Sequence, residues 1–148
     1  MEKILVAVDG SEDSKKALAR CSEIAKCMDC EVILLWVQRS LLELERSDPQ
    51  VEALMRVMEE QDVKKELEAP AMRFLESSRK YLLDHSVKKV KTLLRWGHPV
   101  EEILRAADEE NVDLIVLGSR GRRIGKAFLG SVSREVSERA KVSVMIGR

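Results

Sequence analysis

The sequence is poor in aromatic residues: two Phe, one Tyr and two Trp make up 3% of its 148 residues. Proteins that bind single-stranded nucleic acid stack bases on aromatic side chains, so this scarcity argues against such a function. Net charge is also missing, since 26 basic residues balance 26 acidic ones. A general attraction to DNA or to an anionic membrane is therefore not expected. We expect no nucleic acid and no membrane among the partners.

Long apolar runs and paired cysteines are missing as well. The opening apolar run, Ile4 to Val8, is far too short for an export signal or a membrane span. Three cysteines, an odd number, are typical of reduced thiols and predict a cytoplasmic location. No linker, repeat or low-complexity stretch interrupts the chain. We therefore predict that residues 1–148 form one domain, long enough to bury a core.

The chain alternates between strand and helix patterns. Short, continuous apolar runs predict strands buried on both faces, at Ile4–Val8, Val32–Val37 and Leu114–Leu117. Two further strands are predicted at Val90–Leu94 and Val142–Ile146. Apolar residues at helical spacing predict helices between them, around Ala17–Ala25, Val51–His85, Val100–Asn111 and Val132–Ala140. Pro70 is expected to kink the second of these or to divide it into two abutting helices. The alternation predicts an α/β fold, an open five-stranded parallel sheet with helices on both faces.

Glycines follow the fourth predicted strand. Ligands of such sheets bind beyond the carboxyl ends of the strands, where the strand order reverses, so the turns after the first and fourth strands are the candidates. Glycine lets backbone N–H groups converge on phosphate oxygens, and here it stands at positions Gly118, Gly121, Gly125 and Gly130. Ser131 is predicted to cap the last helix, whose N-terminus attracts anions. Positive charge in the same loop comes from Arg120, Arg122, Arg123 and Lys126. The pattern favours a phosphate site over a basic surface loop with turn glycines.

Two other features carry possible chemistry. Asp9 ends the first strand, where an acid suits ribose hydroxyl groups as an acceptor, although it is also a possible helix N-cap. Cys27 and Cys30 have the CxxC spacing of redox and metal sites. They lack a second ligand pair for zinc and do not open a helix after a strand. We interpret them as thiols without a joint function, and a redox or metal protein remains the alternative.

Several segments together resemble the universal stress protein family. The run from Asp113 to Gly121, followed by Gly130-Ser131-Val132-Ser133, is similar to the family's ATP-binding signature. That signature is a glycine, two residues, a second glycine, nine residues and then Gly-Ser or Gly-Thr; here eight residues separate Gly121 from Gly130. The similarity continues through Ile4–Ser11, Leu34–Val37 and Gly97–Pro99, so it covers nearly the whole chain.

The resemblance implies a Rossmann-like fold of the kind found in adenine nucleotide alpha hydrolases, with ATP, with or without Mg²⁺, as the ligand. By position, Asp9 would hydrogen-bond the ribose, the Val37 backbone would meet the adenine, and the glycines would cradle the phosphates. The implied contacts with the nucleotide are Ala7, Asp9, Val37, Leu117, Gly118, Arg120, Gly121, Gly130, Ser131 and Val132. The resemblance also implies a homodimer through the last strand, Val142 to Ile146.

The function predicted on this basis is a nucleotide-responsive regulatory or stress-response protein with an unidentified protein partner. Neither a Walker loop nor residues that would hold magnesium and position a water can be named, so hydrolysis of ATP is expected to be slow or absent. One alternative is an enzyme similar to ATP pyrophosphatases, whose Ser-Gly-Gly-x-Asp-Ser loop matches Gly10, Asp13 and Ser14 but not Ser11. The other alternative is the same fold without nucleotide binding, acting through protein contacts, which the shortened loop favours.

Overall fold

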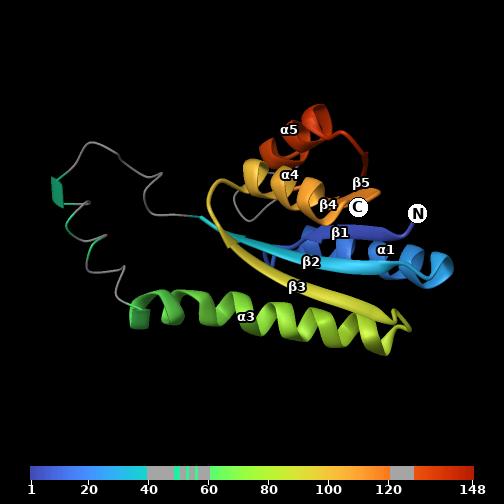
Figure 1. Cartoon of the computed structure of the whole chain (residues 1–148), viewed down its shortest axis with the longest axis horizontal. Coiled ribbons are helices and arrows are strands. Elements are labelled where there is room, and N and C mark those ends of the chain that lie inside the picture. Colours follow the sequence, from blue (N-terminus) through green and yellow to red (C-terminus); the bar gives the residue numbers. More distant parts are fainter. Residues whose placement is uncertain (40–48, 51–52, 54–55, 57–60, 121–128) are drawn as a thin grey trace.

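The computed structural model describes residues 1–39, 49, 50, 53, 56, 61–120 and 129–148. Within them, one parallel sheet has the strand order β3-β2-β1-β4-β5 (Figure 1). The strands are β1 Lys3–Ala7, β2 Glu31–Gln38, β3 Lys89–Trp96, β4 Leu114–Gly118 and β5 Ser143–Gly147. Each overlaps a predicted strand, so the predicted five-stranded parallel sheet is confirmed. β3 runs two residues beyond the predicted Leu94, because Arg95 and Trp96 continue the ladder with β2 despite the polar side chain of Arg95.

The described helices are α1 Glu12–Met28, α3 Gln61–Asp84, α4 Pro99–Glu110 and α5 Ser131–Arg139. None of them has the length and apolar content needed to cross a lipid bilayer. Pro70 lies inside α3, so the predicted division into two helices at this residue is wrong. Proline removes one backbone hydrogen bond, but Ala71, Leu75 and Leu82 are buried, and this packing holds the helix together. The predicted helix start at Val51 lies outside the described residues.

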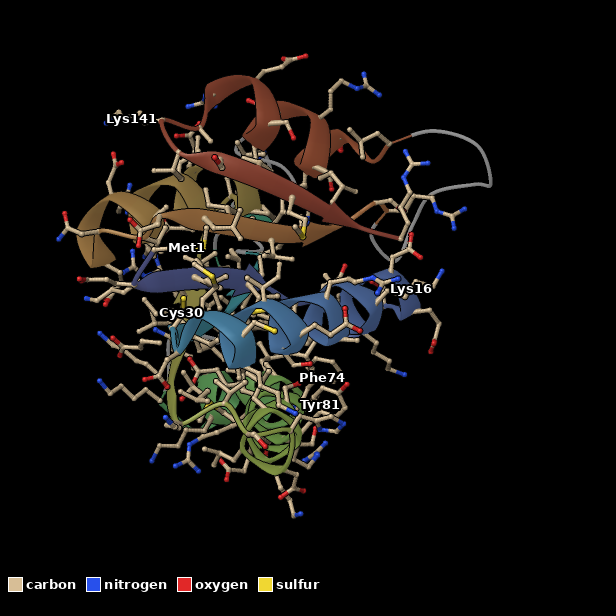
Figure 2. All side chains as sticks on the ribbon, turned by 90° about the vertical axis from the view of Figure 1, so that its right-hand side faces the viewer. Met1, Lys16, Cys30, Phe74, Tyr81 and Lys141 are labelled. Carbon is tan, nitrogen blue, oxygen red and sulfur yellow. The ribbon has the colours of Figure 1, made fainter. Side chains whose placement is uncertain are left out.

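Helices cover both faces of the sheet, as predicted. Successive strand residues point to opposite faces, and this separates two apolar clusters. Ile4 and Val6 of β1 pack on the face covered by α1 and α3, where Phe74 and Tyr81 also lie (Figure 2). Leu5 packs on the opposite face, which α4 and α5 cover (Figure 1). Because both faces are buried, the central strands read as continuous apolar runs.

Candidate functional site

The strand order reverses between β1 and β4. From β1 the chain passes through α1 to β2 on one side, whereas from β4 it passes through α5 to β5 on the other side. The two connections therefore diverge from neighbouring strand ends, and open α/β sheets bind ligands in the crevice expected at such a point. The prediction that the turns after the first and fourth strands share this edge is confirmed.

The first of these turns is built by Asp9, Gly10 and Ser11. The half-buried Asp9 accepts a hydrogen bond from the Ser11 backbone N–H at its Oδ1 atom, at 2.9 Å. Gly10 has a φ of 79°, which glycine adopts without steric penalty. Ser11 is the N-cap of α1 and its side chain accepts from the Ser14 N–H, so the alternative that Asp9 caps the helix is wrong. No described residue donates to Oδ2 of Asp9, and this atom is the one suited to a ligand hydroxyl.

The second turn starts at Gly118, which lies against the first turn of α1. A Cβ atom at this position would stand 2.6 Å from the carbonyl carbon of Asp13 and 2.7 Å from its oxygen. Real Cβ atoms essentially never approach backbone so closely, so only glycine lets β4 pass this close to α1. The need for glycine here is explained by packing between two elements of the protein, whether or not a phosphate binds.

The N-terminus of α5 closes the other side of this turn. The Gly130 N–H donates to the Ser119 carbonyl at 2.6 Å, and the Ser133 hydroxyl donates to the Gly118 carbonyl at 2.6 Å. Gly130 is held in an extended conformation and is the N-cap of α5, so the prediction that Ser131 caps this helix is wrong. Ser131 is instead the exposed first residue of the helix. The N–H groups of a first helical turn have no partner within the helix, which makes them donors for an anion.

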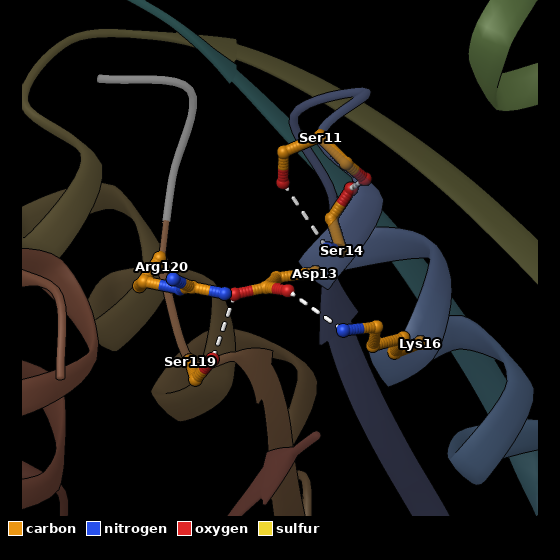
Figure 3. A network of polar contacts seen from close by, with 6 residues as sticks. All are labelled: Ser11, Asp13, Ser14, Lys16, Ser119 and Arg120. Carbon is orange, nitrogen blue, oxygen red and sulfur yellow. Dashed lines mark hydrogen bonds and ion pairs between the residues drawn. The ribbon is translucent and has the colours of Figure 1, made fainter. Parts of the chain in front are cut away.

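A buried carboxylate holds the start of the second turn (Figure 3). Oδ2 of Asp13 accepts from the Ser119 hydroxyl at 2.7 Å and from Nε of Arg120 at 3.0 Å, and Oδ1 pairs with Lys16 at 3.3 Å. The Asp13 side chain is 8% exposed. The hydrogen bonds from Ser119 and Arg120 hold the pKa of Asp13 well below its usual range, so it stays charged at neutral pH. The predicted phosphate ligand Arg120 is thus partly engaged by the protein itself.

This role of Asp13 is one that the sequence alone did not reveal. A signal was present, because Asp13 stands one helical turn before Ala17 on the buried stripe of α1. A charge on such a stripe needs a partner of opposite charge or several hydrogen-bond donors. Which partner it finds depends on the fold, because Ser119 and Arg120 belong to a distant part of the chain.

Four of the predicted nucleotide contacts come together on the face covered by α4 and α5. Leu117 is buried there, and Ala7, Val37 and Val132 are half-buried and pack against the same apolar cluster. They come from β4, β1, β2 and α5 respectively. The remaining loop residues Gly121, Arg122, Arg123, Gly125 and Lys126 lie outside the described residues.

The cysteines of the CxxC segment do not act together in the structure. Cys27 is exposed on α1, Cys30 is buried, and both are free. Burial raises the pKa of the Cys30 thiol, which keeps it protonated and unreactive. Across the described part of the chain, no group of three or more His, Cys, Asp or Glu side chains could hold a metal ion.

The chain is similar in sequence and in fold to universal stress proteins. A sequence model described as "Universal stress protein family" matches residues 1–148. Universal stress protein YxiE of Bacillus subtilis is 34% identical over 99% of this chain and 98% of its own length. The solved structure of protein MJ0577, which is a universal stress protein of Methanocaldococcus jannaschii, has a TM-score of 0.79 at 33% identity and covers 99% of this chain and 94% of its own. A universal stress protein from Archaeoglobus fulgidus, solved in complex with dAMP, has a TM-score of 0.68 at 20% identity and covers 100% of this chain and 98% of its own.

Proposed function

Because the chain belongs to the universal stress protein family, we propose that it binds ATP in the crevice between the ends of β1 and β4. The observation that carries this proposal is the set of groups that lie together at the carboxyl ends of these strands. Half-buried apolar side chains of β1, β2 and α5, a carboxylate oxygen from the turn after β1 and the first turn of α5 lie at the carboxyl end of the sheet. These are the three kinds of contact that a base, a sugar and a phosphate chain require.

Each part of the nucleotide has residues of fitting chemistry. Ala7, Val37 and Val132 offer an apolar surface to the adenine, and the Val37 backbone offers polar atoms to its edge. Oδ2 of Asp9 would accept from a ribose hydroxyl. The phosphates would meet the start of α5 at Ser131 and the guanidinium of Arg120, with the helix dipole adding to the attraction.

Gly118, Leu117, Gly121 and Gly130 are proposed as contacts made through the backbone. Gly118 and Gly130 bound the turn on its two sides, and Leu117 precedes it in β4. Mg²⁺, if present, would be held mainly by the phosphates, as this ion usually is in nucleotide sites. The A. fulgidus protein with dAMP is similar to this chain in fold alone. The choice of ATP as the ligand therefore depends on the glycines, Asp9 and Arg120 of this chain.

The role that fits such a site is regulation. ATP occupancy would change the surface offered to a protein partner in the cytoplasm, and this requires that the two states bind the nucleotide unequally. The proposed unit is one nucleotide-binding domain over residues 1–148. We name no residue as a catalytic base or as a holder of an attacking water, and we propose slow hydrolysis or none.

The two edge strands of the sheet, β3 and β5, differ in charge, and this difference supports a homodimer through the last strand. β3, at one edge, carries the exposed lysines Lys89 and Lys91, which protect an edge against pairing. β5, at the other edge, has the sequence SVMIG without a charge. We propose that Val142 to Ile146 pairs with a second copy.

Light scattering after size exclusion tests this homodimer and should give a dimer mass. The edge substitution Ser143→Lys should lower that mass upon dilution, whereas the same change at Ser137 on α5 should not. A monomeric wild-type protein would remove this part of the proposal.

A charge placed at the start of α5 tests nucleotide binding. Ser131→Glu puts a carboxylate at the first position of the helix, where it stabilises the helix but repels a phosphate. Ser137→Glu is the matched control, since it adds the same charge to an exposed position of the same helix. We expect calorimetry to show ATP binding to the wild-type protein and the control, with at least tenfold weaker binding to Ser131→Glu.

The identity of any nucleotide that accompanies the purified protein completes this test. Denaturation followed by anion-exchange chromatography of the supernatant should release ATP. No released nucleotide together with no heat of titration would reject the proposal. The same fold acting through protein contacts would then be the better account.

A further inference from the structure

Asp13 is a buried carboxylate to which the proposed function gives no role. Its partners Ser119 and Arg120 are the residues that directly follow Gly118, the last residue of β4. Gly118 itself touches the Asp13 backbone. The first turn of α1 is therefore in contact with three consecutive residues, Gly118 to Arg120, where β4 passes into the glycine loop. Gly130 and Ser133, at the start of α5, contact Ser119 and Gly118.

We propose that Asp13 is a positioning residue that holds Ser119 and Arg120 in the arrangement in which Arg120 receives the phosphates of the nucleotide. This inference rests on the proposed function. Asp13 itself would not touch the ligand, because both of its oxygens are occupied by protein donors and its side chain is 8% exposed.

The way in which Asp13 holds Arg120 leaves the guanidinium able to bind a second anion. Only Nε of Arg120 donates to Asp13, and no other described residue engages this side chain. The four N–H groups on Nη1 and Nη2 form the edge that binds phosphate in two-pronged contacts. Because the guanidinium is planar and rigid, fixing Nε also fixes the direction of that edge.

The charge around Asp13 permits this arrangement. One carboxylate is balanced by two cations, Arg120 and Lys16, so the group as a whole keeps a positive charge. A phosphate that approaches Arg120 therefore meets net attraction. The alternative arrangement is that Asp13 competes with the phosphate and keeps Arg120 away from it, which predicts the opposite effect on affinity.

Because Asp13 holds the Arg120 side chain in place before ATP binds, the entropy of ordering that side chain sets the expected loss of affinity in Asp13→Ala. A long side chain that must be immobilised upon binding weakens affinity by roughly twofold to tenfold. Asp13→Ala frees both Arg120 and Ser119, so we expect about tenfold weaker ATP binding. Adenosine has no phosphates, and its affinity should stay within about twofold of wild type, because the apolar contacts lie on the face covered by α4 and α5.

The experiment measures ATP and adenosine affinities by calorimetry in four variants. Asp13→Ala is the main variant, and Asp13→Asn and Ser119→Ala remove less of the network in case the first folds poorly. Glu12→Ala is the matched control: it removes the same charge one residue away, where the carboxylate is exposed and pairs with Lys15 at 2.8 Å. We expect the ratio of ATP to adenosine affinity to fall in every variant of the network and to be unchanged in the control.

A second comparison tests whether Asp13 acts through Arg120. If it does, Arg120→Ala weakens ATP binding, and adding Asp13→Ala causes little further loss, because the two changes remove the same contact. Additive losses in the double variant would contradict this coupling.

The remaining outcomes are distinguishable. Tighter ATP binding by Asp13→Ala would overturn the inference in favour of competition between Asp13 and phosphate. Equal losses for ATP and adenosine would also overturn it, since Asp13 would then support the whole crevice. If the wild-type protein binds ATP and the variants match it, only this inference fails. If the wild-type protein binds no ATP, the proposed function fails and the inference falls with it.

Discussion

The two ends of the sheet differ in how their polar groups are used. At the amino end, the protein satisfies them itself: Oδ2 of Asp113 accepts from the backbone N–H groups of Glu2 and Lys3, at 2.7 and 3.0 Å. The Lys3 ammonium donates to the Glu110 carbonyl at the end of α4, and the Cys30 thiol to the carbonyl of its neighbour Met1 (Figure 2). Cations at helix C-termini complement the helix dipole.

At the carboxyl end the helices α1, α4 and α5 begin, so N–H groups are collected there. At the same end, Asp9 keeps one oxygen without a donor among the described residues. The polar groups at the amino end are thus satisfied within the protein, whereas the carboxyl end presents N–H groups and a carboxylate oxygen that fit the proposed nucleotide. Asp13 is the exception at the carboxyl end, since it closes a contact within the protein.

The largest effect is expected at the close approach of β4 and α1. Gly118→Ala would place a methyl group 2.6 Å from backbone of Asp13. Overpacking of this kind destabilises proteins by about 1–3 kcal/mol, and a clash with backbone belongs at the upper end. Urea denaturation without any nucleotide should show the loss. An unchanged midpoint would mean that the glycine serves only a ligand, and it would weaken the packing account.

A somewhat smaller loss is expected from removing the Asp13 carboxylate. Hydrogen bonds to charged groups contribute about 1.5–3 kcal/mol, so Asp13→Ala should lower the free energy of unfolding by an amount in this range. The folded pKa of Asp13 lies below its value in the unfolded chain, so its contribution is fully present at neutral pH and is lost as the pH falls below about 4. Stability curves of wild type and Asp13→Asn should therefore converge in acid. A gap that persists under acidic conditions would contradict this account of the charge.

At the amino end, Asp113→Asn should cause a smaller loss of stability. The N–H groups of Glu2 and Lys3 lower the pKa of this exposed carboxyl, so its contribution also decreases as the pH falls. Thermal unfolding should detect the decrease. ATP affinity should not change, because this residue lies at the end of the sheet away from the crevice. A loss of ATP affinity comparable with that of Ser131→Glu would break the distinction between the two ends.

The smallest effect concerns the thiols. Cys27 is exposed and should react with a thiol reagent in the folded protein, whereas Cys30 and Cys21 are buried and should react only after unfolding. Burial raises the pKa of Cys21 to about 12, which further slows its reaction. Blocking Cys27 should leave both stability and ATP affinity unchanged. A disulfide between Cys27 and Cys30 in the isolated protein would revive the redox interpretation.

Much of the fold was predictable because the central strands are buried on both faces. Continuous apolar runs such as Leu114–Leu117 predict strands, and their alternation with helical patterns predicts the parallel sheet. Strand ends were less predictable, since Arg95 continues β3 through backbone pairing that its side chain does not reveal. The persistence of α3 through Pro70 likewise depends on tertiary packing.

The site was predictable where it depends on local sequence and not where it depends on distant contacts. The turn at Asp9 and Gly10 and the helix start after Gly130 follow from residue types near them. The cap itself was mistaken, because the Ser119 carbonyl fixes Gly130 in the extended conformation from across the turn. The link from Asp13 to Arg120 and the packing reason for Gly118 arise only when α1 and β4 lie side by side.

The most direct test of the central claim is an ATP titration followed by backbone amide NMR. The account predicts large shifts at Gly10, Gly118, Ser131 and Val132, at the carboxyl end of the sheet, and no change at Cys30 and Asp113, at the amino end. Shifts centred on the amino end, or no shifts with ATP at millimolar concentration, would contradict it.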